Sequence, residues 1–290
     1  SQVSQLSAQV QAAFSALRRI FTLLSEEEEV QEGTVKIDKA SVGGNVSFEH
    51  VRFGYDKDLL MKDVNIEVES GQTVAIVGPT GAGKTTLMNL LLRFYDVKGG
   101  AIKIDGVDIR DMKREDLRSL FSLVLQDTWL FSGSIYDNIR YGRLDARKDE
   151  IISAAKMANV HHYIRTLTKG YDSLINEEAN NISQGEKQLL TIARAILKDP
   201  QILILDEATS SVDTRLERRL QEAMHRVMQG RTSFVIAHRL STIRDADMIL
   251  VLKDGDIVEQ GTHEELLEKK GMYEKLYHSQ FAGQNFDEVF

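Results

Sequence analysis

The chain has no cysteine among its 290 residues, so it can form neither a disulfide nor a thiolate metal site. This absence agrees with a reducing, cytosolic setting.

Basic residues are not in excess, because the chain has 36 Lys and Arg and 44 Asp and Glu. The net charge of −8 argues against broad affinity for nucleic acid. The sequence also lacks any run near the roughly 18 apolar residues that span a bilayer, and it lacks a basic leader or an apolar signal core. We therefore expect a chain that folds in water and does not itself enter a membrane.

The apolar content is sufficient for a sizeable core, since 42% of residues are hydrophobic and 28% are charged. Apolar runs alternate with helical patterns, which predicts a mostly parallel sheet with helices on both faces. These predicted strands lie at 73–77, 101–104, 121–125, 201–206, 232–237 and 248–252. Before them, short β-rich runs at 46–53 and the alternating run at 64–68 predict an antiparallel β subdomain. Between residues 134 and 200 the pattern predicts an inserted helical subdomain, with helices near 134–140, 148–158, 161–167 and 184–197.

The first residues predict a helix with one narrow apolar stripe, because apolar side chains recur at spacings of three and four. The stripe consists of Val3, Leu6, Val10, Ala13, Leu17, Ile20 and Leu24. Such a helix could pack on its own domain or could continue a structure outside this sequence, and a start at Ser1 without methionine suggests a segment of something larger. We expect this helix in residues 1–31, a linker in 32–45, the main domain in 46–280 and a loose tail in 281–290.

A glycine-rich loop lies between the strand at 73–77 and a predicted helix at 86–92. It consists of Gly78, Pro79, Thr80, Gly81, Ala82, Gly83, Lys84 and Thr85, and Thr86 follows it in the helix. The glycines allow backbone N–H groups to point at phosphate oxygens, and the helix N-terminus adds its positive end. Lys84 is placed to reach the β- and γ-phosphates and Thr85 to ligate Mg²⁺. A glycine-rich turn without a ligand needs neither a lysine nor a hydroxyl at these positions, so the loop predicts a nucleotide site.

A second chemical element is the pair of acids after the strand at 201–206. Near a phosphate loop, Asp206 would lie next to Mg²⁺ and Glu207 nearer the γ-phosphate. Glu207 is the natural general base, because it could polarise the attacking water and the phosphate charge should raise its proton affinity. Paired acids after a strand also occur as a solvated helix start. Their combination with Lys84 favours the catalytic interpretation.

A third element opens the predicted helix at 184–197. Ser183 and Glu186 fit a capping box, in which the serine caps the helix and the glutamate reaches back to the cap. A capped helix N-terminus is also an anion site, and Gly185 exposes backbone to an approaching group. The two interpretations coexist.

These elements occur in an order that resembles the nucleotide-binding domain of ATP-binding cassette (ABC) transporters. The motifs are the phosphate loop, Gln126 at a strand end, Ser183-Gln184-Gly185, Asp206-Glu207, Ser211-Val212-Asp213 and His238 after Ala237. Tyr55 and the runs 127–135, 208–213 and 237–243 are similar to the exporter branch in particular. Single motifs of this kind are weak, but six in the right order leave chance negligible. The resemblance covers residues 46–280, and residues 1–31 are similar to the cytoplasmic end of an exporter's last membrane helix.

The resemblance implies an α/β fold: a P-loop NTPase core with a mostly parallel sheet, an antiparallel β subdomain and an inserted helical subdomain. It also implies roles for single residues. Tyr55 would stack on adenine. Gln126 would touch Mg²⁺ and the attacking water, and His238 would hold the γ-phosphate, although a lone histidine at a strand end is more often structural. The residues that would meet ATP bound on a second subunit are Ser183, Gly185 and Asp213.

The resemblance further implies ATP binding and hydrolysis that power export, in a transporter of the multidrug or lipid type. The partners would be a second nucleotide-binding domain and a membrane-spanning domain, at the cytoplasmic face of the cell membrane, with no nucleic acid. Residues 129–131 would contact the membrane-spanning domain, and core packing explains Leu130 and Phe131 equally well. The alternative is a soluble ABC ATPase without a transport role, which predicts a second cassette or a coiled-coil arm, and the sequence shows neither.

The sequence departs from the family at the signature, which usually reads Leu-Ser-Gly-Gly-Gln. Gln184 replaces a glycine and Glu186 replaces the glutamine. A like charge near the γ-phosphate can cost about 1 to 4 kcal/mol at the dielectric of a protein surface. Lys84, Glu207 and His238 are intact, so we predict a heterodimer with unequal sites, and a homodimer that tolerates the altered signature is the competing prediction.

Overall fold

The computed structural model describes residues 2–29, 33–125, 128–177, 179–206, 214–237 and 240–280. Its contacts divide the chain into two units, Ser1–Glu32 and Gly33–Phe290, and each is described here by itself. The first contains one helix, α1 (Gln2–Leu24), and the apolar stripe is exposed along it, with Val3 83% and Leu24 72% accessible. Among the described residues, no helix combines the length and the apolarity needed to cross a bilayer.

A six-stranded sheet forms the centre of the second unit, in the order β12-β11-β3-β10-β9-β6. Five neighbouring strands are parallel, and β12 pairs antiparallel with β11 at one edge. This confirms the predicted, mostly parallel sheet. The strands are β3 (Thr73–Val77), β6 (Phe121–Val124), β9 (Ile202–Asp206), β10 (Thr232–Ile236), β11 (Met248–Lys253) and β12 (Asp256–Gly261).

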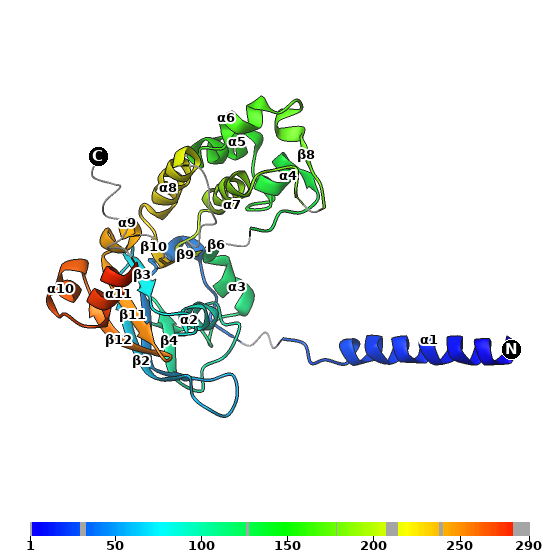
Figure 1. Ribbon diagram of the computed structural model, residues 1–290, viewed down its shortest axis with the longest axis horizontal. Coiled ribbons are helices and arrows are strands. Elements are labelled where there is room, and N and C mark those ends of the chain that lie inside the picture. Colours follow the sequence, from blue (N-terminus) through cyan, green and yellow to red (C-terminus); the bar gives the residue numbers. More distant parts are fainter. Residues whose placement is uncertain are drawn as a thin grey trace. The chain divides into compact units, whose positions relative to one another are not determined.

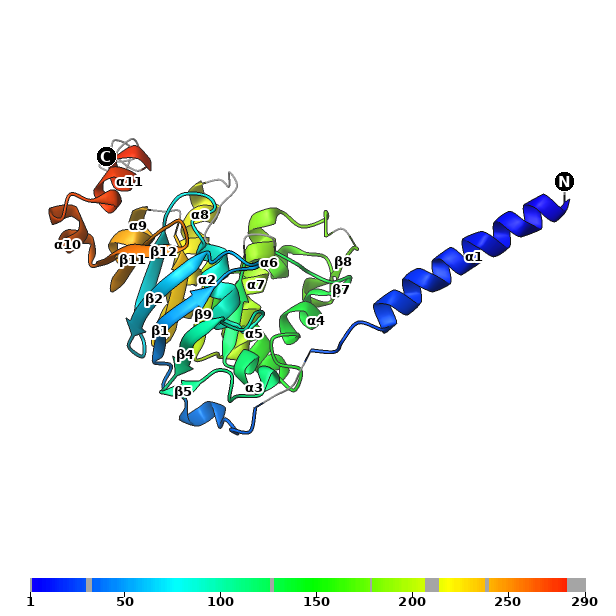
Figure 2. The same cartoon turned by 90° about the horizontal axis from the view of Figure 1, so that it is seen from below.

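A separate four-stranded antiparallel sheet has the order β2-β1-β4-β5, and Figure 2 shows its three longer strands side by side. Its strands are β1 (Val46–Phe53), β2 (Met61–Val68), β4 (Gly99–Ile104) and β5 (Val107–Asp108). The predicted strand at 101–104 thus belongs to this sheet. A third, two-stranded sheet pairs β7 (Gly133–Ser134) with β8 (Leu174–Ile175).

Helices α4 to α7 gather in one part of this unit, and α8 lies beside α7 (Figure 1). This part contains α4 (Ile135–Arg140), α5 (Lys148–Met157), α6 (His161–Thr166) and α7 (Gln184–Lys198), which confirms the predicted helical subdomain. The other helices are α2 (Lys84–Leu91), α3 (Arg114–Ser119), α8 (Thr214–Met228), α9 (Leu240–Arg244), α10 (His263–Glu268) and α11 (Met272–Gln280), with single 3₁₀ turns at Lys39–Ser41 and Gly170–Asp172.

Two hydrophobic cores lie on opposite faces of the parallel sheet. Side chains of a strand alternate between faces, so β9 contributes Leu203 and Leu205 to one core and Ile202 and Ile204 to the other. The first core continues into the helical part. The second continues to the antiparallel sheet and to α2. Burial on both faces explains why these strands read as continuous apolar runs.

The predicted linker is residues 32–45, and its described part, 33–45, belongs to the second unit and hydrogen-bonds to other residues of that unit. The Val35 N–H donates to the Asp111 carbonyl at 3.0 Å. The Asp105 carboxylate accepts from the Gly43 N–H at 2.7 Å and from the Asn45 N–H at 2.9 Å. The described part of this segment is therefore attached to the domain surface at defined points, and the domain boundaries remain a prediction.

Candidate nucleotide site

The phosphate loop connects the end of β3 to the start of α2, as the sequence predicts. Gly78 has a φ of +152°, and a Cβ there would lie 2.3 Å from the Leu252 carbonyl oxygen, so only glycine fits. Gly83 is the N-cap of α2, with a φ of 101° and no side-chain cap. The first turn of α2 is thus left without a capping side chain at its N-cap, which suits a helix N-terminus that binds an anion.

The Lys84 side chain folds back over the loop. Its Nζ donates to the carbonyls of Gly78 at 2.7 Å and Pro79 at 3.0 Å. Burial lowers the pKa of Lys84, and the nearby Asp206 carboxylate acts in the opposite direction. The phosphate loop and Asp206 both lie at the carboxyl ends of parallel strands of the same sheet, β3 and β9, with β10 between them.

Thr85 and Asp206 offer oxygen ligands at this position. Thr85 is exposed in the first turn of α2, and Asp206 is half-buried at the carboxyl end of β9. No group of three or more His, Asp or Glu side chains in the described part of the chain could hold a metal. A hydroxyl and one carboxylate fit Mg²⁺, which commonly takes its remaining ligands from phosphate and water.

Tyr55 lies beside the first turn of α2. Its hydroxyl is 3.0 Å from the Thr86 Oγ1, and its ring makes edge contacts, with centroids 5.1 Å apart, with both Phe53 and Tyr95. The residue remains 53% exposed. Its neighbours therefore fix the ring while leaving much of it accessible.

Ser183 and Gly185 lie at the start of α7. Ser183 is the N-cap, and its Oγ accepts from the Glu186 N–H at 3.3 Å, which is one half of the predicted capping box. Gly185 is buried, and the Gln184 side chain donates to the Thr128 Oγ1 at 3.3 Å. Among the described residues, no hydrogen bond joins Ser183 or Gly185 to the phosphate loop of the same chain.

Four predicted site residues fall outside the described residues. They are Gln126, Glu207, Asp213 and His238. The strand β9 ends at Asp206, and Glu207 is the next residue along the chain. The roles of these four residues therefore rest on the sequence.

Arg194 on α7 is an organising residue that the sequence did not single out. Its guanidinium donates to the Trp129 carbonyl at 2.7 Å and to the carbonyl and the Oδ1 of Asn138 at 2.5 Å each. It also lies over the Phe131 and Tyr141 rings, 5.7 and 5.5 Å from the ring centroids. Burial lowers its pKa to about 10. The sequence feature that could have pointed to Arg194 is its position as an arginine among the apolar residues of a predicted helix.

Comparisons with known proteins identify the class to which this site belongs. Residues 61–210 match the family described as ABC transporter. The chain is 51% identical, over 93% of its length and 45% of the relative, to an uncharacterised ABC transporter ATP-binding protein of Bacillus subtilis. It is 51% identical, over 95% of its length and 44% of the relative, to a fatty acid ABC transporter ATP-binding/permease protein of Mycobacterium tuberculosis. It is 44% identical, over 94% of its length and 45% of the relative, to an ATP-dependent lipid A-core flippase of Syntrophus aciditrophicus.

A solved structure agrees. A bacterial Atm1-family ABC exporter with ATP bound aligns with a TM-score of 0.82 at 40% identity, covering 94% of this chain and 48% of that one. The chain belongs to the ABC transporter family, and its second unit has the fold of the ATP-binding domain. The resemblance to exporters is confirmed, and none of these relatives supports the soluble alternative. The chain spans a little under half the length of these relatives.

Proposed function

We propose that this chain hydrolyses ATP to power export through a membrane-spanning domain, at the cytoplasmic face of a membrane. The observation that carries the proposal is the phosphate loop, in which Lys84 lies over the loop carbonyls and interacts with Asp206 at the end of β9. The similarity to exporters over more than nine-tenths of the chain supplies the transport part of the proposal.

In the proposed ATP site, the ring of Tyr55 faces the adenine, and the backbone N–H groups of residues 78–86 surround the phosphates. Lys84 then exchanges its two carbonyl partners for β- and γ-phosphate oxygens, whose negative charge stabilises an ammonium that burial disfavours. Thr85, Asp206 and Gln126 would hold Mg²⁺. The ion would neutralise the negative charge that develops on the phosphates during transfer.

Glu207 would accept a proton from the attacking water, and His238 would hold the γ-phosphate in line with that water. Ser183, Gly185 and Asp213 would act on ATP bound to a second nucleotide-binding domain. The structure of α7 is compatible with this assignment, because Ser183 and Gly185 open a helix whose N-terminus can face an anion. Each complete site would then need two subunits.

Residues 1–31 would continue the last membrane helix of the transporter. The exposed apolar stripe on α1 fits a helix that packs against other helices. Trp129, which is 63% exposed and joined through its carbonyl to Arg194, would contact the membrane-spanning domain. Arg194 would then link that contact to α7 and its signature residues.

Two substitutions test the assignment. Glu207→Gln should keep ATP affinity and lower turnover by about a hundredfold or more, because the general base is lost and the binding groups remain. Lys84→Ala should instead weaken ATP binding, and Lys62→Ala, which removes an exposed lysine, is the matched control. Steady-state hydrolysis and equilibrium nucleotide binding, measured in the assembled transporter, separate the two effects. Equal turnover of Glu207→Gln and wild type would remove Glu207 from its role.

We further propose that the second nucleotide-binding domain is a non-identical subunit. Gln184 and Glu186 alter the signature while Lys84, Glu207 and His238 are intact, so this chain's phosphate loop pairs best with a standard signature from another chain. Purification of the native complex, followed by identification of its subunits, tests this. A second, related subunit, with nearly all activity lost on Glu207→Gln, is expected. A single polypeptide that holds two equivalent occluded nucleotides would show a homodimer instead.

A further inference from the structure

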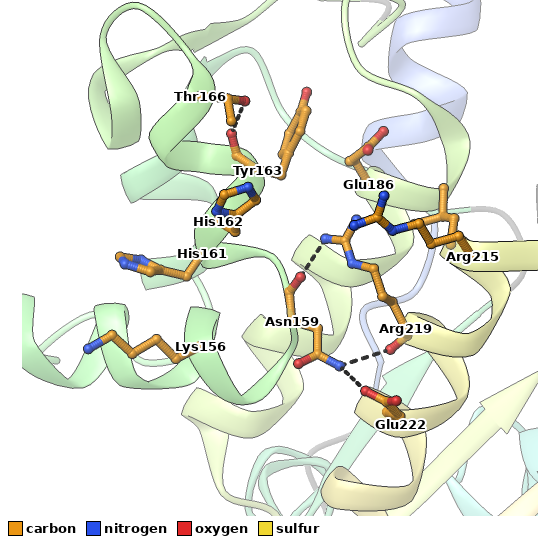
Figure 3. A pocket seen from close by; sticks show the side chains of 11 residues that line it. Lys156, Asn159, His161, His162, Tyr163, Thr166, Glu186, Arg215, Arg219 and Glu222 are labelled. Atoms are coloured by element: carbon orange, nitrogen blue, oxygen red, sulfur yellow. Dashed lines mark hydrogen bonds between the residues drawn. The ribbon is translucent and has the colours of Figure 1, made fainter.

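A pocket of about 680 Å³ lies between α6 and α8 and is bordered by the first turn of α7 (Figure 3). One of its lining residues is Glu186, the carboxylate that stands where the family signature has glutamine. The pocket lies between the helical subdomain and α8, and the lining residue Glu186 is in the first turn of α7, the helix that begins with Ser183 and Gly185. Charges within it therefore act close to the signature.

Glu186 directs its charge into this pocket. Burial raises the pKa of Tyr163 on α6, and the negative charge of Glu186 raises it further. Tyr163 lines the same pocket. The backbone N–H of Glu186 donates to the Ser183 Oγ, and its side chain lies at the edge of the pocket (Figure 3). The sequence predicts that this carboxylate repels a γ-phosphate. The size of that repulsion also depends on the charged side chains on the other walls of the pocket.

Those walls carry two arginines one turn apart on α8. Arg215 and Arg219 both line the pocket, and Figure 3 shows their guanidinium groups pointing into the part of it where Glu186 lies. Arg219 is anchored, because its guanidinium donates to the Asn159 carbonyl at 2.5 Å. The two positive charges and the carboxylate thus line the same pocket.

Asn159 holds α8 against the turn between α5 and α6. It has a left-handed φ of 57°, and its Nδ2 donates to the Glu222 Oε2 at 3.0 Å. Its Oδ1 accepts from Arg226 at 2.7 Å. These bonds join α8 to the turn between α5 and α6. The distance across the pocket is therefore set by the fold rather than by flexible side chains alone.

We propose that Arg215, supported by Arg219, is a positioning residue that offsets the charge of Glu186 across the pocket. This inference rests on the proposed function, because it concerns the signature face that meets ATP on a second subunit. Opposite charges on two neighbouring helices lower the negative potential at the start of α7, and the altered signature can then approach a γ-phosphate. The Gln184 side chain is likewise engaged within this chain, through its bond to Thr128.

The test is a double-mutant cycle on ATP hydrolysis in the complete transporter. Arg215→Ala should lower kcat/KM for ATP by about three- to tenfold, since it leaves the Glu186 charge less compensated. Adding Glu186→Gln should restore the rate to within about twofold of wild type. Arg218→Ala is the matched control, because it removes an equal charge from an exposed position of α8 outside the pocket and should leave the rate unchanged.

The salt dependence of the hydrolysis rate distinguishes an electrostatic role of Arg215 from a structural one, because loss of a purely structural contact would not depend on ionic strength in this way. Screening lengths fall from about 10 Å at 0.1 M to about 3 Å at 1 M, so the deficit of Arg215→Ala relative to wild type should shrink at high salt. A double variant as slow as Arg215→Ala, or a deficit that is independent of salt, would overturn the proposal. Lys84→Ala measured in parallel tests the proposed function separately: if it leaves hydrolysis intact, that function fails, whatever Arg215 does.

Discussion

Tyr55 illustrates what a single residue contributes beyond its sequence motif. The motif predicts an aromatic face for adenine, and the structure adds the hydroxyl contact with Thr86 and two edge contacts with neighbouring rings. These contacts restrict the ring before any nucleotide arrives, which lowers the entropy lost on binding. The ring, more than the hydroxyl, should therefore determine ATP affinity.

We predict that Tyr55→Ala weakens ATP binding by about tenfold or more, because stacking of a base on an aromatic ring contributes about 1–3 kcal/mol. Tyr55→Phe keeps the ring and loses only the contact with Thr86, so its affinity should stay within about threefold of wild type. Isothermal titration calorimetry with Mg-ATP measures both. If the alanine variant binds ATP as tightly as wild type, adenine does not stack on this residue.

Glu186 shows a limit of sequence reasoning at the residue scale. Its position in the signature could be read from the sequence, and so could the bond from its backbone N–H to the Ser183 cap, whereas the predicted reach of its carboxylate back to the cap is not part of the α7 N-cap. The direction of its side chain could not, because that direction depends on the pocket between α6 and α8, whose walls are far apart in the sequence. The same holds for Gln184 and its partner Thr128.

At the scale of elements, the helices and strands predicted best are those with strong apolar periodicity. The helices expected near 148–158 and 184–197 are found at Lys148–Met157 and Gln184–Lys198. The strand β12 was not predicted, because half of its residues are Asp, Glu or Gln and none of its residues is buried. The Asp254-Gly255 pair in the sequence could have predicted this hairpin, because Asp-Gly is typical of two-residue hairpin turns. In the structure both residues have positive φ and form such a turn. Asp105 and Gly106 do the same between β4 and β5.

Arg194 should stabilise the contact between α7 and residues 129–138. Arg194→Ala leaves the Trp129 carbonyl and the fully buried Asn138 without their guanidinium donors. An unsatisfied buried acceptor costs about 1–3 kcal/mol, so the free energy of unfolding should fall by about 2–4 kcal/mol. Urea denaturation measures this. Arg140→Ala is the control, because it removes an exposed arginine with one bond to the Leu144 carbonyl, and an equal loss for both variants would contradict the prediction.

The helices α10 and α11 are joined by a buried contact that should depend on pH. The His263 Nδ1 lies 2.7 Å from the Tyr273 hydroxyl, and burial lowers the pKa of His263 below its ordinary value of 6.5. The unfolded chain therefore binds a proton more readily than the folded chain as the pH falls below about 6.5, and stability should decline in that range.

Thermal unfolding between pH 7.5 and 5.5 checks this prediction. His263→Gln should flatten the loss of stability at the acidic end. Part of the slope should remain, because burial, followed by the charge of Lys156, also lowers the pKa of His161. An unchanged slope in His263→Gln would show that His263 does not titrate as its burial implies.

For the molecule as a whole, the fold places the two halves of the proposed chemistry on different parts of one chain. The phosphate loop and Asp206 lie at the carboxyl ends of parallel strands, whereas Ser183 and Gly185 begin a helix of the helical subdomain. The sequence predicted both halves because each carries an ordered motif. The pairing of two chains, like the second subunit itself, is a property of the assembly, and it remains a proposal.

The most direct test of that pairing is the ATP hydrolysis rate of this chain, measured against its own concentration with saturating Mg-ATP. If each site needs two chains, the rate per mole of protein should rise with concentration as dimers form, and it should be slow in dilute solution. Sedimentation should show mostly monomer without nucleotide. A rate per mole that stays constant from dilute to concentrated protein, with a monomer throughout, would contradict a composite site.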